Sequence, residues 1–396
     1  MRPLLVCCAI AATGCAIDSN PPPPPTDDEL VRGALAPLVP AGATLVDWLT
    51  DNYSSKDEFP NSFSLARAPL TGGTLVYLKG GSGRGTERFY VERGGVLTKV
   101  EGAPFVPTTS SAVLRTELGA AGEDGLVLRC TTGDGVLSAV RAGKLVPLRD
   151  TSRFCGANPR LGPSAVAGHF TIATFASARK FSLESFRIEG DALVSASAPL
   201  SRDLGADWAG PTWFGELETG VLATVTIAKD GWTYERSDRP AATIPPPFPN
   251  APILRRNGAL IEALGHDGDR ERWVSWNVDD GKVIDAGTVA SLAGPSWRPG
   301  AAFGEWLTWS VTAGTDGSPL SVPTEFRMRL EKPGALAIES LPSTPCVSRT
   351  ACRTVGESYP LGVVGAPEAR VGLYLFWSWR GGSALWASPV AGRPVP

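Results

Sequence analysis

The stretch "GLVLRCTTGDGVLSAV", residues 125–140, places two apolar runs on either side of an Asp-Gly dipeptide. Residues two apart in a strand point to the same face, so each run predicts a strand with one face on a core. The dipeptide Asp134-Gly135 is typical of tight hairpins, which require residues that accept positive φ angles. The stretch therefore predicts a strand, a hairpin and a second strand.

The same pattern recurs along the chain from about residue 41 onward. Further runs with period two are Thr74–Leu78, Arg88–Val91, Thr171–Phe175 and Leu222–Ile227. Further turn signals are Gly94-Gly95, Asp230-Gly231, Asp280-Gly281 and Asp316-Gly317. No long run in this part has the spacing of an amphipathic helix, so the fold class that follows is all-β.

Units that run strand, hairpin, strand follow one another at regular spacing. They begin near Pro69, Ser111, Pro163, Pro211, Pro252, Pro295 and Leu361, at steps of about 42 to 52 residues with one longer step. A four-stranded blade of a β-propeller consumes such a length. We therefore expect a seven-bladed β-propeller over residues 41–396. The strand around residues 44–48 would complete the final blade beside residues 372–377, and closing the ring would remove exposed sheet edges.

One of these units carries a longer repeat pattern. Its residues are Pro295, Ser296, Trp297, Arg298, Pro299, Gly300 and Phe303, and Pro211-Thr212-Trp213 is a fragment of the same pattern. They resemble the Pro-x-Trp-Ser-Pro-Asp-Gly repeat, with a following Phe, of TolB-type β-propellers. The resemblance implies the same fold, although this chain lacks the Asp that usually precedes the glycine.

A second architecture is compatible with the sequence. The proline-rich segment "RPAATIPPPFPNAP", residues 239–252, would then divide the body into two β-sandwich domains. Proline clusters inside β proteins also form edges and loops, where no ladder hydrogen bond is lost. We favour the propeller and keep the two sandwiches as the alternative.

The first fourteen residues have the features of an export signal: Arg2, a mostly apolar run over residues 4–12, and small residues before Cys15. The tetrad Ala12-Thr13-Gly14-Cys15 resembles the lipobox of bacterial lipoproteins. That resemblance implies cleavage before Cys15, a thioether-linked lipid on it, and, from the Ala16 that follows, an outer-membrane location. The alternative is a plain secreted protein in which Cys15 has no role.

A tether is expected between this signal and the body. Pro21–Pro25 favour the polyproline II conformation, which rises about 3.1 Å per residue. Thr26 and Glu29 then form a capping-box pair that predicts a short helix. The expected organisation is a signal peptide over residues 1–14, a tether with a short helix over 15–40, and a propeller over 41–396.

Cysteine usage fits an oxidising compartment. Of the seven cysteines, Cys7 and Cys8 would leave with the signal and Cys15 would carry lipid, so four remain for the body. Three pairings are possible, and proximity in sequence favours Cys130 with Cys155 and Cys346 with Cys352. A zinc site does not fit the spacing, because no Cys-x-x-Cys occurs and neither histidine lies near a cysteine.

The charge and composition exclude some classes of partner. A formal net charge of −3 offers no basic field, so we expect no nucleic-acid partner. Hydrophobic residues make up 43% of the chain, enough for an ordinary core.

One loop gathers groups that could bind a ligand. In "GHDGDRE", residues 265–271, the candidate binding residues are His266, Asp267, Asp269 and Glu271. The three acids match positions 1, 3 and 5 of a calcium loop, but Arg272 and Val278 stand where that loop needs Gly and Glu. We therefore expect a polar hairpin tip without a metal, and the sequence gives no sign of a cofactor. His169 we interpret as an edge residue with a satisfied ring rather than a catalytic base.

Tryptophan is abundant, with 12 copies. Trp377 and Trp379, two apart, would share one face of a strand and are candidates for stacking on a sugar ring. Most of the others we expect to pack between blades.

Two functional hypotheses follow. The first is an envelope lipoprotein, anchored to the membrane by its lipid, whose non-catalytic propeller binds a protein or glycan partner. The second is an envelope hydrolase or lyase that uses carboxylates on a propeller face. The sequence contains no complete catalytic constellation, which favours the first hypothesis.

Overall fold

The computed structural model describes most of the β-rich body of the chain. The described residues are 29, 33, 42–48, 64–79, 87–102, 115–131, 134–177, 180–203, 211–228, 231–244, 253–257, 260–267, 270–277, 279–280, 282–290, 297–303, 306–312, 323–332, 335–340, 356–365, 371–378, 383–389 and 393–394. The predicted signal peptide, Cys15, nearly all of the predicted tether, Cys346 and Cys352 lie outside these ranges. Within them, no helix is long and apolar enough to cross a membrane.

The described strands form seven antiparallel sheets, which we number as blades 1 to 7. Blade 1 contains β2 (Ser64–Leu70), β3 (Gly73–Lys79), β4 (Glu87–Arg93) and β5 (Val96–Lys99). Blade 2 contains β6 (Arg115–Ala121), β7 (Asp124–Thr131), β8 (Asp134–Arg141) and β9 (Lys144–Pro147). Blade 3 contains β10 (Arg160–Gly162), β11 (His169–Ser177), β12 (Lys180–Glu189), β13 (Ala192–Ser195) and β14 (Leu200–Asp203). A 3-10 helix, η3 (Ser152–Ala157), precedes blade 3.

The later blades follow the same plan. Blade 4 contains β15 (Pro211–Glu218), β16 (Val221–Ala228), β17 (Gly231–Arg236) and β18 (Arg239–Ile244). Blade 5 contains β19 (Ile253–Asn257), β20 (Leu260–Asp267), β21 (Arg270–Asn277) and β22 (Val283–Ala290). Blade 6 contains β23 (Trp297–Phe303), β24 (Trp306–Thr312), β25 (Pro323–Lys332), β26 (Ala335–Ser340) and β30 (Arg393–Pro394). Blade 7 contains β27 (Gly356–Val364), β28 (Val371–Ser378), β29 (Ser383–Pro389) and β1 (Thr44–Trp48).

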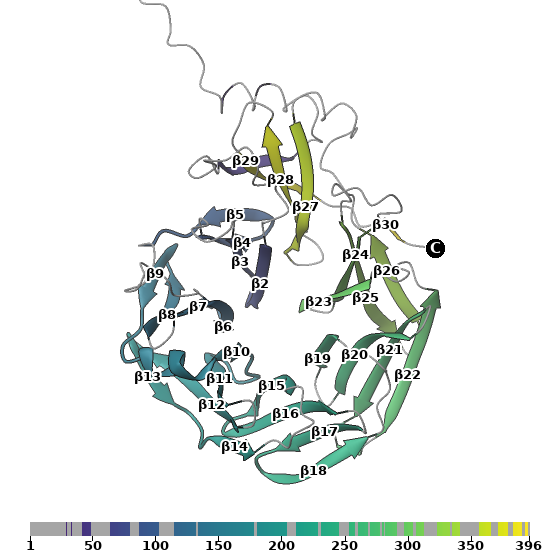
Figure 1. The fold of residues 1–396 in the computed structure, drawn as a ribbon. Coiled ribbons are helices and arrows are strands. Elements are labelled where there is room, and N and C mark those ends of the chain that lie inside the picture. Colours follow the sequence, from purple (N-terminus) through teal and green to yellow (C-terminus); the bar gives the residue numbers. More distant parts are fainter. Residues whose placement is uncertain are drawn as a thin grey trace, which may run out of the picture.

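The sheets stand around a common centre, with the first strand of each of blades 1 to 6 nearest to it (Figure 1). This is a seven-bladed β-propeller. Every predicted unit start lies within five residues of the first residue of an innermost strand. Pro211 coincides with the start of β15, whereas Pro69 and Leu361 lie furthest from the starts of β2 and β27. The prediction of an all-β propeller is confirmed.

The alternative of two sandwich domains is wrong. The strands on either side of the proline-rich segment, β18 and β19, belong to neighbouring blades of one ring. Blades 4 and 5 share a continuous core that includes Trp232 and Tyr234 on one side and Ile261 and Trp276 on the other. The segment therefore joins two blades rather than two domains, and its first residues form β18.

The ring is closed by strands from both ends of the described chain. Strand β1 pairs with β29 and forms the outer edge of blade 7. The prediction placed this strand beside residues 372–377 of β28, but β29 lies between the two. Near the other end, β30 pairs with β26 at the outer edge of blade 6. Blade 7 thus receives its last strand from the residues that precede blade 1.

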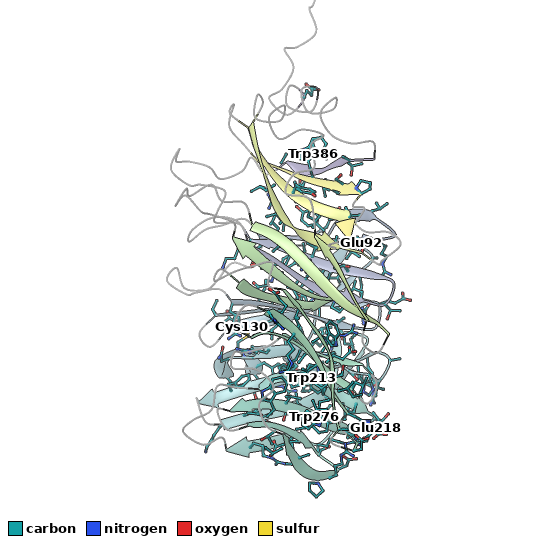
Figure 2. All side chains as sticks on the ribbon, turned by 90° about the vertical axis from the view of Figure 1, so that its right-hand side faces the viewer. Glu92, Cys130, Trp213, Glu218, Trp276 and Trp386 are labelled. Atoms are coloured by element: carbon teal, nitrogen blue, oxygen red, sulfur yellow. A yellow bond between two sulfur atoms is a disulfide. The ribbon has the colours of Figure 1, made fainter. Side chains whose placement is uncertain are left out.

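Among the described side chains, hydrophobic cores fill the spaces between blades 7 and 1 and between successive blades from 1 to 5. The side view shows Trp213 and Trp276 within this stack of sheets (Figure 2). Alternate residues of a central strand enter different cores: in β7, Leu126 and Leu128 pack toward blade 3, whereas Val127 packs toward blade 1. The alternation predicted one buried face per strand. In fact both faces are buried, because each sheet has a blade on either side.

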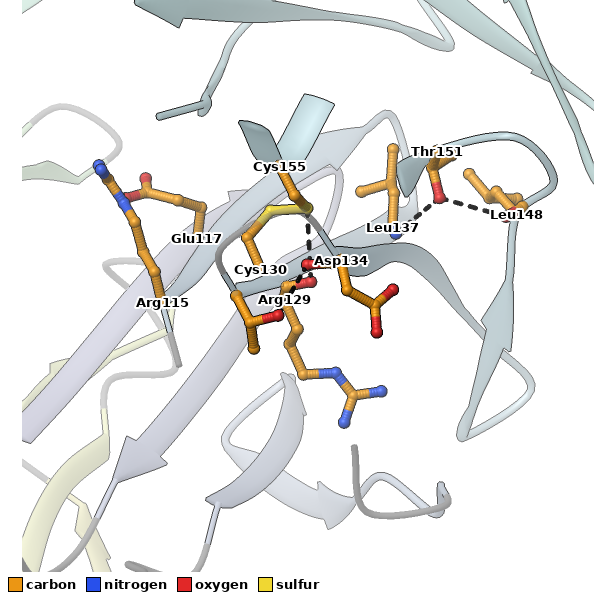
Figure 3. The surroundings of a disulfide bond; sticks show 10 residues. Arg115, Glu117, Arg129, Cys130, Asp134, Leu137, Leu148, Thr151 and Cys155 are labelled. Carbon is orange, nitrogen blue, oxygen red and sulfur yellow. Dashed lines mark hydrogen bonds and ion pairs between the residues drawn. A yellow bond between two sulfur atoms is a disulfide. The ribbon is translucent and has the colours of Figure 1, made fainter. Parts of the chain in front are cut away.

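A disulfide joins Cys130 of β7 to Cys155 of η3, with 5.1 Å between their Cα atoms (Figure 3). The predicted pairing of these two cysteines is confirmed, and it fastens η3 onto blade 2. The turn predicted at Asp134-Gly135 is wrong by two residues, since Thr131 pairs with Asp134 and Cys130 with Gly135. By contrast, Gly94 and Gly95 have φ of 57° and 86° and form the predicted hairpin tip between β4 and β5.

Gly135 is required by the disulfide rather than by a turn. A Cβ atom at this position would lie 2.2 Å from Cys155 Sγ and 2.4 Å from the Arg129 carbonyl oxygen. We therefore expect Gly135→Ala to lower the free energy of unfolding by about 1–3 kcal/mol, because the strand and the disulfide cannot both keep their places. Urea unfolding of the oxidised protein measures this loss.

Gly156→Ala is the matched control for this substitution. Gly156 lies next to Cys155, and a Cβ atom there would meet nothing within 4 Å. Its unfolding midpoint should stay close to that of the parent protein. Equal midpoints for Gly135→Ala and the parent would contradict the steric argument.

Candidate functional site

The candidate binding residues of the sequence fall in two places. His266 and Asp267 end β20 and pair in register with Glu271 and Arg270 at the start of β21. The side chain of Glu271 is fully buried within the blade. Trp377 lies in β28, opposite Glu357 of β27 and Ser383 of β29. Asp269 and Trp379 lie outside the described residues, so the binding roles of this set stay predictions.

The described residues enclose a different site at the hub of the ring. A cavity of about 780 Å³ lies where the first strands of five consecutive blades, 1 to 5, approach one another. Its wall is mainly apolar and includes Leu70, Leu118, Leu161, Trp213 and Leu254. This volume falls in the range of pockets that hold small molecules or single side chains of a partner.

Glycines allow the innermost strands to pack closely around this cavity. A Cβ atom on Gly119 of β6 would lie 2.9 Å from Leu161 of β10. A Cβ atom on Gly162 of β10 would lie 2.3 Å from the ring of Phe214 in β15. At each of these contacts a glycine on one blade receives a large side chain from the next blade, which brings the strands together at the crowded centre.

His169 and Glu216 form a polar pair in the cavity wall. His169 is the first residue of β11 in blade 3, and Glu216 lies in β15 of blade 4. His169 Nδ1 lies 3.0 Å from Glu216 Oε2. The Glu216 side chain is fully buried, whereas the His169 side chain keeps 12% of its surface exposed. Nδ1 of the imidazole thus has a hydrogen-bond partner, as the sequence interpretation held. The residue also lines the hub cavity and does not lie only at a strand edge.

Glu216 is saturated with donors. Its Oε2 accepts hydrogen bonds from Ser164 Oγ and Ser185 Oγ, both at 2.6 Å, as well as from His169. Its Oε1 accepts one from the backbone N–H of Gly220 at 3.0 Å. Three of these donors belong to blade 3 or to the connection within it, so a carboxylate of blade 4 holds the two blades together at the hub.

The same contacts favour the ionised form of Glu216. Burial alone would raise the pKa of Glu216, but the hydrogen bonds from Ser164, Ser185, Gly220 and His169 outweigh it, so the pKa lies below its ordinary value. An ionised carboxylate can only accept, so Nδ1 of His169 must donate. Nε2 of a neutral His169 is then left as a hydrogen-bond acceptor.

Two arginines add positive charge to the cavity wall. Arg67 lies in β2 of blade 1 and Arg255 in β19 of blade 5. Arg255 forms an ion pair with the buried Glu262, and its guanidinium lies 5.7 Å from the ring centre of Trp273. Neither Glu262 nor any acid besides Glu216 is among the described residues that line the cavity.

This site could not be found from sequence patterns alone. His169 and Glu216 are 47 residues apart, and only the packing of blade 3 on blade 4 brings them together. The available signal was Glu216, which lies between apolar residues in the strand "TWFGELE". A carboxylate that is buried in such a strand must have hydrogen-bond partners.

No known protein family and no curated protein sequence matches this chain. Among solved structures, it is similar to a Mycobacterium tuberculosis puromycin-hydrolyzing peptidase, with 14% identity and a TM-score of 0.38 over 84% of this chain. It spans 61% of the length of that peptidase. It is also similar to virginiamycin B lyase from Staphylococcus aureus, with 11% identity, a TM-score of 0.42, and coverage of 88% of this chain and 100% of the lyase. A third similar structure is the WD40 domain of fission-yeast SCAP, with 8% identity, a TM-score of 0.38, and coverage of 87% and 91% of the two chains. These likenesses concern the fold alone.

We expect Glu216→Gln to lower the free energy of unfolding by about 1–3 kcal/mol at neutral pH, because the amide NH₂ would face hydrogen-bond donors. The folded state lowers the pKa of Glu216, so its stabilising effect is complete above the unfolded-state pKa of about 4.3. That effect is lost as the pH falls through the folded-state pKa. Urea titrations between pH 7 and pH 3 should therefore show the parent and variant converging as the solution becomes acidic.

Glu218→Gln provides the control on the same strand. The Glu218 side chain is 65% exposed and pairs with Arg236 at the surface, so its replacement should change stability little at any pH. A difference between parent and Glu216→Gln that stayed constant down to pH 3 would contradict the assignment of an ionised, hydrogen-bonded Glu216.

Proposed function

We propose that this chain is a membrane-anchored lipoprotein of the bacterial cell envelope whose propeller binds a protein or glycan partner through its hub cavity, without catalysis. The observation that carries the binding role is the cavity itself. It is preformed, it is lined by five blades, and it combines an apolar wall with a few fixed polar groups. That combination is typical of binding sites.

The second hypothesis, a hydrolase or lyase that uses carboxylates, has less support at this cavity. Glu216 is the carboxylate among the described lining residues, and its side chain has no exposed surface. Both of its oxygens accept hydrogen bonds from the protein. A carboxylate in this position orients His169 but does not reach a ligand.

The anchoring role rests on the lipobox Ala12-Thr13-Gly14-Cys15. Multiple acyl chains on one residue provide stable membrane attachment, which a single chain does not. A polyproline tether between that residue and the ring would keep the propeller clear of the bilayer.

Growth with an alkyne analogue of palmitate tests the anchor. The parent protein should take up the label and sediment with membranes, whereas Cys15→Ala should lose the label. Cys130→Ala is unsuitable as a control because it breaks the disulfide, so Ala16→Ser serves instead, and it should keep the label. An unlabelled parent protein, or label that survives Cys15→Ala, would refute the lipoprotein assignment.

Site-directed crosslinking tests partner binding at the hub. Ala167 is exposed and lines the cavity, so a benzoylphenylalanine at this position would reach an occupant without disturbing a core. Light-dependent adducts should form in cells at position 167. The same amino acid at Val96, which is 65% exposed on β5, should give none. Adducts that form equally at both positions, or at neither, would contradict binding at the hub.

A further inference from the structure

The hub cavity presents three kinds of recognition element together. Leu118, Leu161 and Trp213 are part of an apolar wall. Arg67 and Arg255 bring positive charge from blades 1 and 5. His169 carries an imidazole whose Nδ1 is held by Glu216, so that Nε2 is the ring nitrogen left for a ligand.

We propose that the hub cavity binds the C-terminal residue of a peptide chain, or an N-acyl amino acid of the same chemistry, with an apolar side chain and a free carboxylate. In this assignment the arginines bind the carboxylate, Nε2 of His169 accepts the amide N–H, and the apolar wall receives the side chain. The proposal rests on the proposed function and names the chemistry of its ligand.

The two lining arginines are the groups that an anion would meet, and Arg255 is already paired with Glu262. Glu216, the acid of the described lining, has its oxygens occupied by Ser164, Ser185, His169 and Gly220, so it offers no acceptor to a ligand and its charge is shared with these donors. A guanidinium has five N–H donors, so Arg255 can keep its contact with Glu262 and still bind a second acceptor. Arginine is also the side chain best suited to planar, bidentate recognition of a carboxylate.

The polar side chains of the described wall are Arg67, Thr71, Ser164, His169, Glu216 and Arg255, and the last four already have partners within the protein. A saccharide presents several hydroxyl groups that must each find a partner when buried, and the described wall is mainly Ala, Pro, Leu, Val and Gly. An apolar amino acid side chain needs no such partners. One acceptor for one amide N–H matches a single peptide bond.

Calorimetry with synthetic peptides tests this assignment. We expect acetyl-Ala-Ala-Phe with a free carboxylate to bind the purified propeller at least tenfold more tightly than the same peptide with a C-terminal amide. Arg255→Gln and Arg67→Gln should each reduce the affinity for the acid about tenfold and leave the affinity for the amide nearly unchanged. Far-UV circular dichroism and the unfolding midpoint verify that each variant is folded.

Two tryptophan substitutions locate the binding. Ala167→Trp fills the rim of the cavity and should abolish binding of the peptide acid, whereas Val96→Trp on β5 should bind like the parent. N-acetylphenylalanine, compared with the tripeptide, distinguishes the two sources: similar affinities indicate a small N-acyl amino acid, and much tighter tripeptide binding indicates a protein C-terminus.

The outcomes separate this proposal from the function on which it rests. Equal affinities for the peptide acid and amide, or binding that survives Ala167→Trp, would overturn the carboxylate assignment. Binding of chitotriose in place of the peptides would also overturn it, while a hub-binding propeller would remain. If no probe binds and no crosslinked adduct forms at position 167, both proposals fail together.

Discussion

The structure depends on the burial of central strands between two other blades, as β7 shows. Leu126, Val127 and Leu128 of β7 are buried, yet they belong to two different cores, one toward each neighbouring blade. A single blade would expose both of these faces, so the sheets are stable only as a closed ring. Closure falls to β1, whose Asp47 accepts a hydrogen bond from Tyr90 at 2.9 Å and pairs with Lys99 at 2.8 Å. Both partners belong to blade 1, so one strand at the edge of blade 7 holds the first and last blades together.

Small and polar residues allow the inner strands to pack together at the hub. The inner strands approach one another too closely for large side chains everywhere, and glycines at positions 119 and 162 relieve that crowding. Between blades 3 and 4 the contact is polar, and Glu216 gathers donors from Ser164, Ser185 and His169. A buried carboxylate is costly without partners, but with these donors it fixes the relative position of two blades. As a by-product it orients the imidazole that faces the cavity.

Sequence patterns predicted the repeated blades, and they missed the contacts that form only when neighbouring blades pack together. The spacing of the predicted units placed each blade within a few residues, because most blades are built from four strands and so take up a similar length of chain. The pairing of Cys130 with Cys155 followed from proximity, since η3 follows blade 2 closely in sequence and packs against it. The role of Gly135 could not be predicted in this way. The glycine makes room for the disulfide, but in the sequence Asp134-Gly135 has the appearance of a turn signal. The contact of His169 with Glu216 was invisible for a different reason: its two halves lie on different blades, and no local pattern reports packing between blades.

The topology places the proposed anchor and the proposed binding cavity at different parts of the ring. The order of strands in blade 7 puts β1 at the outer edge and β27 at the inner one. The chain that leads from the proposed lipid site at Cys15 therefore joins the ring at its rim, on the strand that closes it. The hub cavity is lined by the inner strands of blades 1 to 5. Within blade 7, three strands (β29, β28 and β27) separate β1 from the centre of the ring. A tether attached at the rim leaves the centre of the disc open, so a membrane-bound propeller of this topology can hold a ligand at its hub without competition from its own anchor.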